Sequence, residues 1–198
     1  MLKMTNVTFA FDKKNIINDF SMELNKGEIL AVMGTSGCGK TTLLGLMAGL
    51  LKPQEGEIEN SFEKISYVFQ EPRLFPWLTV KENLLAVMDD KDENTLKTVT
   101  ECLALVGLED ALDKYPNELS GGMKSRVSLA RALAFGGDLF LLDEPFAALD
   151  EDLRISLAGK VKEYLRANGT SAILVTHNRE DAEKIADRTL IFPLTNSQ

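Results

Sequence analysis

The chain has 198 residues, a length that suits one domain with an inserted subdomain. Its apolar share of 44% and charged share of 26% are ordinary for a globular protein with a sizeable core. The net charge of −8 argues against binding to nucleic acid, whose phosphates require clusters of Lys and Arg. Composition therefore favours a globular protein that does not act on nucleic acid.

The cysteines and the lengths of the apolar runs indicate in which cellular compartment the protein works. Cys38 lies in a glycine-rich loop, and Cys102 lies among apolar residues of a predicted helix, where it suits a small core position. Two cysteines give no disulfide framework, which is typical of a reducing cytosol. No apolar run reaches the roughly 20 residues of a membrane-spanning helix, and the first residues do not resemble a signal peptide. We therefore expect a cytoplasmic protein that does not itself cross a membrane.

The first third of the chain predicts short strands and then a phosphate-binding loop. Segments 3–9, 20–24 and 28–33 have strand-like patterns, and 42–48 has the pattern of a helix. The loop between strand and helix matches G-x-x-x-x-G-K-[ST], with the residues Gly34, Thr35, Ser36, Gly37, Cys38, Gly39, Lys40 and Thr41, followed by Thr42.

This order predicts a P-loop, because glycines let successive N–H groups point at phosphate oxygens and the helix adds its positive end. Lys40 is expected to reach the β- and γ-phosphates, and the Thr41 hydroxyl to bind Mg²⁺. The alternative is a chance glycine-rich turn. The bare pattern arises by accident in on the order of one chain in a hundred, given average glycine usage.

The rest of the chain alternates strands and helices around a helical insertion. Strands are expected at 56–59, 65–69, 139–142, 172–175 and 189–192, and helices at 80–88, 94–106, 121–135, 151–167 and 179–186. The sequence 79–82 is a capping box, and 89–93 is expected to form a solvated turn. This alternation implies a largely parallel sheet covered on both faces. We divide the chain into a core of 1–70 and 136–198 and a helical insertion of 71–135.

Three polar side chains follow buried strands. Asp143 and Glu144 end the strand at 139–142, and His177 follows the strand at 172–175. Because ligands collect at the carboxyl ends of parallel strands, all three are expected near the P-loop phosphates. Asp143 could hold Mg²⁺, Glu144 could orient or deprotonate water, and His177 could donate to a γ-phosphate oxygen. The alternatives are a solvated acidic turn and a structural histidine.

A second anion-binding candidate lies at 119–123. Ser120 can cap the following helix, and Gly121 and Gly122 leave several N–H donors accessible. Ordinary helix capping is the alternative. Because one nucleotide rarely needs two such sites on one subunit, we expect this one to contact a nucleotide that another subunit holds.

Together these motifs, in this order, resemble the nucleotide-binding subunit of an ABC transporter. The loop at 34–41 matches the family's Walker A motif, 119–123 its signature motif and 139–143 its Walker B motif. Further matches are Gln70 with the Q-loop glutamine, Glu144 with the catalytic glutamate, Asp150 with the D-loop aspartate, His177 with the switch histidine, and Phe11 with the aromatic residue that stacks on adenine. Phe9 is a nearby competitor for the last role, and a core phenylalanine is its alternative.

The resemblance implies a P-loop NTPase with a RecA-like, mostly parallel core, an N-terminal antiparallel β subdomain and an inserted helical subdomain. It implies ATP hydrolysis with Mg²⁺, with Lys40, Gln70, Glu144 and His177 as catalytic residues. Thr41, Gln70 and Asp143 are the implied metal ligands. An ATP-sandwich dimer follows, in which Ser120, Gly121, Gly122 and Asp150 contact nucleotide across the interface.

Family resemblance also implies partners. A second copy or a paralogous ATPase would complete the dimer, and integral membrane permease subunits would hold it at the cytoplasmic face of the membrane. A substrate-binding protein would act indirectly. The apolar segment 75–78 could receive a permease helix, or Trp77 could instead pack the insertion against the core.

The segment 68–77 and Met123 resemble the importer branch for nitrate, sulfonate, taurine and thiamine precursors. Met123 stands where the family usually has glutamine, so a capping box with Ser120 cannot form there. Rival interpretations are a non-transport ABC ATPase that acts on ribosomes or DNA, an unrelated P-loop kinase or GTPase, and a binding protein without catalysis.

Overall fold

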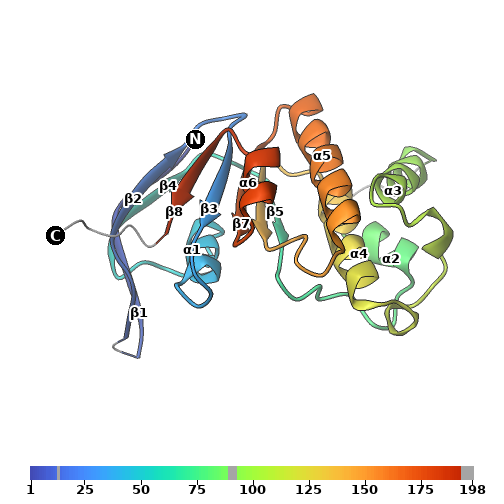
Figure 1. The fold of residues 1–198 in the computed structure, drawn as a ribbon, viewed down its shortest axis with the longest axis horizontal. Helices are drawn as coiled ribbons and strands as arrows, with labels where there is room; N and C mark the ends of the chain where they lie inside the picture. The colour runs from blue at the N-terminus through green and yellow to red at the C-terminus, as the bar shows by residue number, and fades with distance from the viewer. Residues whose placement is uncertain (13, 89–92, 193–198) are drawn as a thin grey trace.

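The computed structural model describes residues 1–12, 14–88 and 93–192. The described residues form a three-stranded and a five-stranded sheet. Figure 1 shows the first sheet at one end of the molecule, the second with its helices in the middle, and a helical part at the other end. No helix in the described ranges has both the length and the apolar character needed to cross a membrane.

The three-stranded sheet is antiparallel, in the order β2-β1-β4. It consists of β1 (Leu2–Phe11), β2 (Lys14–Leu24) and β4 (Glu55–Asn60). The sequence predicts β2 only from residue 20, and that start is wrong. Its pairing with β1 shifts register between Val7 and Phe9, and Asp19 has a left-handed φ of 47°. Such a bulge breaks the two-residue alternation and hides the first half of the strand.

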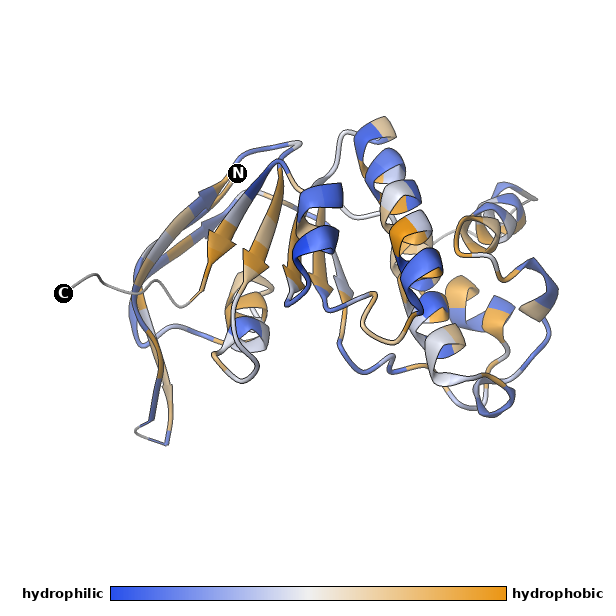
Figure 2. Cartoon of the chain, in the orientation of Figure 1, coloured by the Kyte–Doolittle hydropathy of each residue, from blue (hydrophilic) through white to orange (hydrophobic). Residues whose placement is uncertain are grey.

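The five-stranded sheet is parallel throughout, which confirms the sequence prediction. Its order is β5 (Ile65–Val68), β6 (Leu139–Asp143), β7 (Ser171–Thr176), β3 (Ile29–Met33) and β8 (Arg188–Ile191). The helices α1 (Lys40–Met47), α5 (Glu151–Ala167) and α6 (Arg179–Ile185) connect and cover these strands. In Figure 2 the strands are mostly apolar, whereas α5 and α6 carry much polar surface. The two faces of β6 enter different cores, with Leu139 and Leu141 in one and Phe140 and Leu142 in the other.

The helical part contains α2 (Val80–Leu85), α3 (Glu93–Leu105) and α4 (Gly121–Phe135), with short 3₁₀ turns at Glu109–Ala111 and Pro116–Glu118. The predicted capping box is confirmed, because Thr79 and Glu82 bond each other's backbone N–H groups. The helix α2 ends at Leu85, before the expected residue 88, and continues only as tighter i to i+3 turns. The expected turn at 89–93 lies almost entirely outside the described residues.

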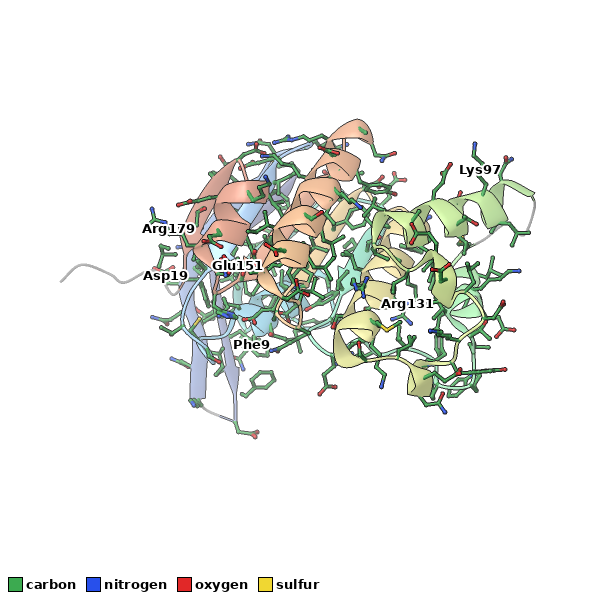
Figure 3. The ribbon with its side chains drawn as sticks, turned by 45° about the vertical axis from the view of Figure 1, so that its right-hand side comes forward. Phe9, Asp19, Lys97, Arg131, Glu151 and Arg179 are labelled. Atoms are coloured by element: carbon green, nitrogen blue, oxygen red, sulfur yellow. The ribbon has the colours of Figure 1, made fainter. Side chains whose placement is uncertain are left out.

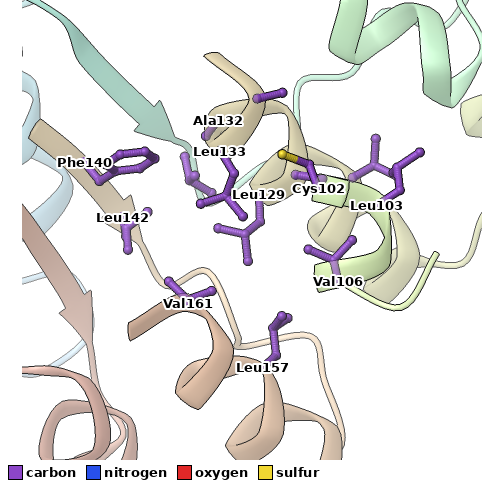
Figure 4. Packing of buried hydrophobic residues seen from close by; sticks show 14 of the residues in the cluster. Cys102, Leu103, Val106, Leu129, Ala132, Leu133, Phe140, Leu142, Leu157 and Val161 are labelled. Carbon is purple, nitrogen blue, oxygen red and sulfur yellow. The ribbon is translucent and has the colours of Figure 1, made fainter. Parts of the chain in front are cut away.

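One apolar cluster joins the helical part to the parallel sheet. Figure 4 shows Cys102 of α3 and Val106, which follows that helix, near Leu129 of α4, with Phe140 of β6 and Val161 of α5 close by. Burial raises the pKa of Cys102 to about 12, so its thiol is an inert core group, as expected. The division into a core of 1–70 and 136–198 and an insertion of 71–135 stays a prediction.

Candidate active site

The carboxyl ends of four adjacent strands bring the predicted site residues together. Gly34 follows β3, Gln70 follows β5, Asp143 ends β6 and His177 follows β7. The register places Asp143 opposite Val175 and Met33 opposite Thr176, so these strands finish at nearly the same level. One pocket at this edge is lined by Ile16, Ser36, Gly37, Gly39, Lys40, Thr41, Thr42, Gln70, Asp143 and Glu144.

The loop at 34–41 turns tightly around the side chain of Lys40. Its buried ammonium group donates hydrogen bonds to the carbonyl oxygens of Gly34 and Thr35, over 2.8 and 2.9 Å. Gly39 caps α1 with a φ of 104°, and a Cβ there would lie 2.7 Å from Ile16. Only glycine fits this backbone without strain, so the turn into α1 requires glycine at position 39.

A hydroxyl and a carboxylate meet at the inner side of the pocket. Thr41 Oγ1 donates a hydrogen bond of 2.7 Å to Asp143 Oδ2. Asp143 is only 2% exposed, and this burial raises its pKa, although the hydrogen bond from Thr41 offsets part of the shift. Two hard oxygen donors held this close suit Mg²⁺, which prefers such ligands and keeps several waters. Gln70 lines the same pocket.

Glu144 and His177 form a pair beside the pocket. His177 Nδ1 lies 3.0 Å from Glu144 Oε2, and the side chains are 62% and 15% exposed, respectively. Glu144 has a left-handed φ of 47°, while its N–H donates to the carbonyl of Val175. Sparsely populated backbone conformations of this kind cluster at functional sites. Glu144 is thus largely buried and not a freely solvated turn residue, whereas His177 has an exposed imidazole that contacts it.

The second anion-binding candidate lies elsewhere on the molecule. Ser120 caps α4 by accepting a hydrogen bond from the N–H of Met123, without the reciprocal bond that glutamine could supply. Figure 1 places α4 in the helical part, well away from α1 and the P-loop. Asp150 caps α5 through the N–H of Leu153. A Cβ on Gly122 would lie 2.9 Å from the carbonyl oxygen of Ala148, so the two predicted interface motifs touch each other.

The two phenylalanines that are candidates for adenine stacking differ in exposure. Phe11 is 49% exposed at the end of β1, whereas Phe9 is buried in the core. Their rings meet edge to face, with centroids 4.8 Å apart. Of the two, Phe11 has the ring that a ligand can reach.

The loop after Gln70 is fastened to the helical part. Arg131 of α4, labelled in Figure 3, donates to the carbonyl oxygens of Pro72 and Arg73. The amide of Asn83 bonds the backbone of the same loop at Phe75. Trp77 is 70% exposed, so it does not pack the insertion against the core.

Sequence reasoning missed two features of the site. Ile16 lines the P-loop pocket from the half of β2 that the pattern did not reveal. Arg154 of α5 lines a second pocket together with Glu144 and His177. In the sequence, Arg154 is one charged residue on a predicted amphipathic helix, and no local pattern indicates a partner far away in the chain.

Comparison with known proteins supports the resemblance drawn from the motifs. The model of the family described as "ABC transporter" matches residues 17–147. An aliphatic sulfonates import ATP-binding protein, SsuB 2 of Paraburkholderia xenovorans, is 44% identical and aligns over 89% of this chain and 70% of its own length. The ergothioneine transport ATP-binding protein EgtV of Helicobacter pylori is 38% identical and aligns over 96% of both chains.

A third relative is longer than this chain. The Fe(3+) ions import ATP-binding protein FbpC 2 of Haemophilus influenzae is 39% identical over 97% of this chain, which spans 59% of that relative. Among solved structures, the dimeric post-hydrolysis state of the ATP-binding cassette MJ0796 bound to ADP and Pi matches with a TM-score of 0.87 and 30% identity, over 96% of this chain and 94% of that one. The expected P-loop NTPase fold is therefore confirmed, and the chain belongs to the ABC transporter family as one of its ATP-binding cassettes.

Proposed function

We propose that the chain is the ATP-hydrolysing subunit of an ABC importer. The observation that carries this proposal is the contact of 3.0 Å between Glu144 and His177, beside the pocket that Lys40 and Thr41 line. A carboxylate so placed can orient or deprotonate a water molecule, which a protein that only binds nucleotide has no need to do.

ATP binds at the P-loop in this scheme. The backbone N–H groups at 37–41 and the N-terminus of α1 face the phosphates, and the Lys40 ammonium exchanges its carbonyl partners for the β- and γ-phosphate oxygens. Phe11 stacks on the adenine ring, a role supported by its exposure and by the burial of Phe9. Ile16 adds apolar contact at the edge of the same pocket.

Thr41 and Asp143 would hold Mg²⁺, and Gln70 lies where it can contribute a further oxygen. When bound there, the ion would supply charge neutralisation for the phosphates during hydrolysis. Glu144 aligns the attacking water, and His177 fixes the Glu144 carboxylate through its Nδ1. Most of the rate enhancement then comes from positioning and electrostatics.

A second subunit completes each site. Ser120, Gly121 and Gly122 form the start of α4, a helix that Figure 1 places in the helical part, away from α1. The similarity to a dimeric cassette supports a dimer of this chain, or of this chain with a paralogous ATPase, in which these residues and Asp150 cover the partner's ATP. Closure and reopening around ATP would be the mechanical step.

The membrane partner is a permease, and the site of action is the cytoplasmic face of the membrane. The relatives compared here are named for import or transport, which favours a transporter over an ABC ATPase that acts on ribosomes or DNA. The exposed Phe75 and Trp77, next to a groove lined by Phe69, Arg73 and Arg131, offer apolar surface for a permease helix. A substrate-binding protein would deliver the cargo, as in the importer branch that segment 68–77 resembles.

Hydrolysis by the purified full chain tests this proposal. Glu144→Gln keeps the size of the side chain and one acceptor oxygen but removes its charge, so turnover should fall by about 100-fold or more while ATP binding persists. Glu101→Gln, an exposed change on α3, is the matched control. Lys40→Ala should abolish ATP binding itself. Wild-type turnover in Glu144→Gln would overturn the assignment.

A further inference from the structure

An ion pair between two helices lies behind His177. Arg154 of α5 donates to Asp181 Oδ1 and to Glu180 Oε2, each over 2.7 Å, and both acceptors belong to the first turn of α6. The Arg154 and Asp181 side chains are buried, whereas Glu180 is largely exposed. Asp181 is therefore the buried partner of the Arg154 guanidinium group, and Glu180 is the exposed partner.

Asp181 in turn holds the backbone on both sides of His177. Its second carboxylate oxygen accepts a hydrogen bond of 3.4 Å from the Thr176 hydroxyl, which itself accepts one of 3.0 Å from the N–H of Asn178. The side chain of Asn178 caps α6 by accepting from the N–H groups of Glu180 and Asp181. The imidazole is exposed, but the peptide units that carry it are tied to Asp181.

Arg154 also stands close to the predicted interface motifs. It lies one turn into α5, where its N–H donates to the carbonyl oxygen of Asp150, the residue that caps this helix. Arg154, Glu144, His177 and Asp181 line one pocket. The guanidinium thus connects the helix that Asp150 begins with the loop that carries His177.

A stabilising role alone explains this pair poorly. Buried ion pairs contribute little net stability, because desolvation cancels most of their attraction, and well-packed apolar residues often replace them without loss. What the ion pair does supply is a fixed position of α6 relative to α5. A displacement of about 1 Å at a reacting group can lower a rate by as much as 100-fold.

We propose that Arg154 is a positioning residue for ATP hydrolysis, which acts through Asp181 to hold the His177 loop so that the imidazole meets Glu144. This inference rests on the proposed function. Among the described residues, those that line the P-loop pocket do not include Arg154, so its removal should alter the rate of hydrolysis and leave the binding of ATP to a single subunit unchanged.

Arg154→Met keeps the apolar part of the side chain and removes the guanidinium group. We expect its kcat to fall by about 10- to 100-fold, with the Kd for ATP unchanged. Because Arg154 acts through His177, the same change made in His177→Ala should lower kcat no further. A purely structural role predicts that the two losses add.

Controls on α6, the helix that carries Asp181, separate this effect from general disturbance. Arg179 forms an exposed ion pair with Glu183 on α6 and points away from the molecule in Figure 3. Arg179→Met should therefore keep wild-type kcat. Glu180→Gln, which removes only the charge of the exposed partner of Arg154, should have a small effect on kcat.

Asp181→Asn tests the same inference if Arg154→Met does not fold. The asparagine keeps an acceptor for the Thr176 hydroxyl and removes the ion pair with Arg154. It should show the same fall in kcat and the same lack of additivity with His177→Ala. Unchanged kcat, or losses that add, would overturn the inference. Normal turnover in His177→Ala with none in Glu144→Gln would also overturn it but leave the proposed ATPase intact, whereas wild-type turnover in Glu144→Gln would overturn the proposed function itself.

Discussion

The Thr41 hydroxyl lies 2.7 Å from a carboxylate oxygen of Asp143, a residue 102 positions farther along the chain. This hydrogen bond joins the first turn of α1 to the end of β6, so the P-loop and the acidic strand end form one unit. It also leaves an ionisable group almost wholly buried, with a pKa raised by that burial. The part of the site where we propose that Mg²⁺ binds is thus formed at a cost in folding stability.

Asp143→Asn should therefore stabilise the nucleotide-free protein while it abolishes hydrolysis. A folded-state pKa above the unfolded one means that ionised Asp143 opposes folding, and this penalty grows as the pH rises from the ordinary Asp range through the raised pKa. The asparagine oxygen can still accept from Thr41. We expect Tm to rise by a few degrees at pH 8 and the gain to shrink as the pH is lowered toward the ordinary Asp range.

Thermal unfolding at several pH values, without nucleotide or metal, measures this effect. Asp113→Asn, an exposed change in a surface turn, should leave Tm nearly unchanged throughout. A lower Tm for Asp143→Asn at pH 8 would contradict the expectation.

Local signals in the sequence were enough for most of the fold. The bounds of α4 and α5 agree with the prediction, because Ser120 and Asp150 cap their starts and Gly136 and Gly169 follow their ends. The parallel sheet followed from buried strands that alternate with helices. The P-loop and the strand-end carboxylates were visible because each is a short contiguous motif.

What the sequence could not predict depends on pairs that are far apart in the chain. The first half of β2 is hidden by a bulge, and with it the contact of Ile16 with the pocket. The Arg154–Asp181 ion pair joins two helices, and each partner alone resembles a solvated charge on a helix surface. Such contacts follow from packing, which no local pattern records.

The assignment of adenine stacking to Phe11 makes a separable prediction. Phe11→Ala should weaken ATP binding by about tenfold, since a base that stacks on an aromatic ring is worth roughly 1–3 kcal/mol. Its Tm should barely change, because the ring is half exposed. Phe9→Ala should instead destabilise the fold by about 3–5 kcal/mol, the usual loss for a buried phenylalanine.

Nucleotide affinity and thermal unfolding, measured on the same preparations, distinguish the two roles. Phe11→Tyr should bind ATP with an affinity close to that of the wild type, because a phenol ring stacks as well as a phenyl ring. Wild-type affinity in Phe11→Ala would exclude stacking by this ring.

The two glycines of the signature motif are not equivalent. A Cβ on Gly122 would lie 2.9 Å from the carbonyl oxygen of Ala148, whereas a Cβ on Gly121 would meet no atom within 4 Å. Gly122→Ala should therefore push the start of α4 away from the loop before Asp150 and cost about 1–3 kcal/mol of stability, as overpacking does. Gly121→Ala should fold at least as stably as wild type, because alanine is the better helix former.

Chemical denaturation of both variants measures the difference. Gly122→Ala should also lose turnover, since its displaced helix start carries Ser120, while ATP binding by a single subunit persists because the P-loop lies on another part of the molecule. Equal stability of the two variants would show that α4 does not rest on the Ala148 carbonyl. Loss of single-subunit ATP binding in Gly122→Ala would place the signature motif at its own P-loop and so contradict the shared site.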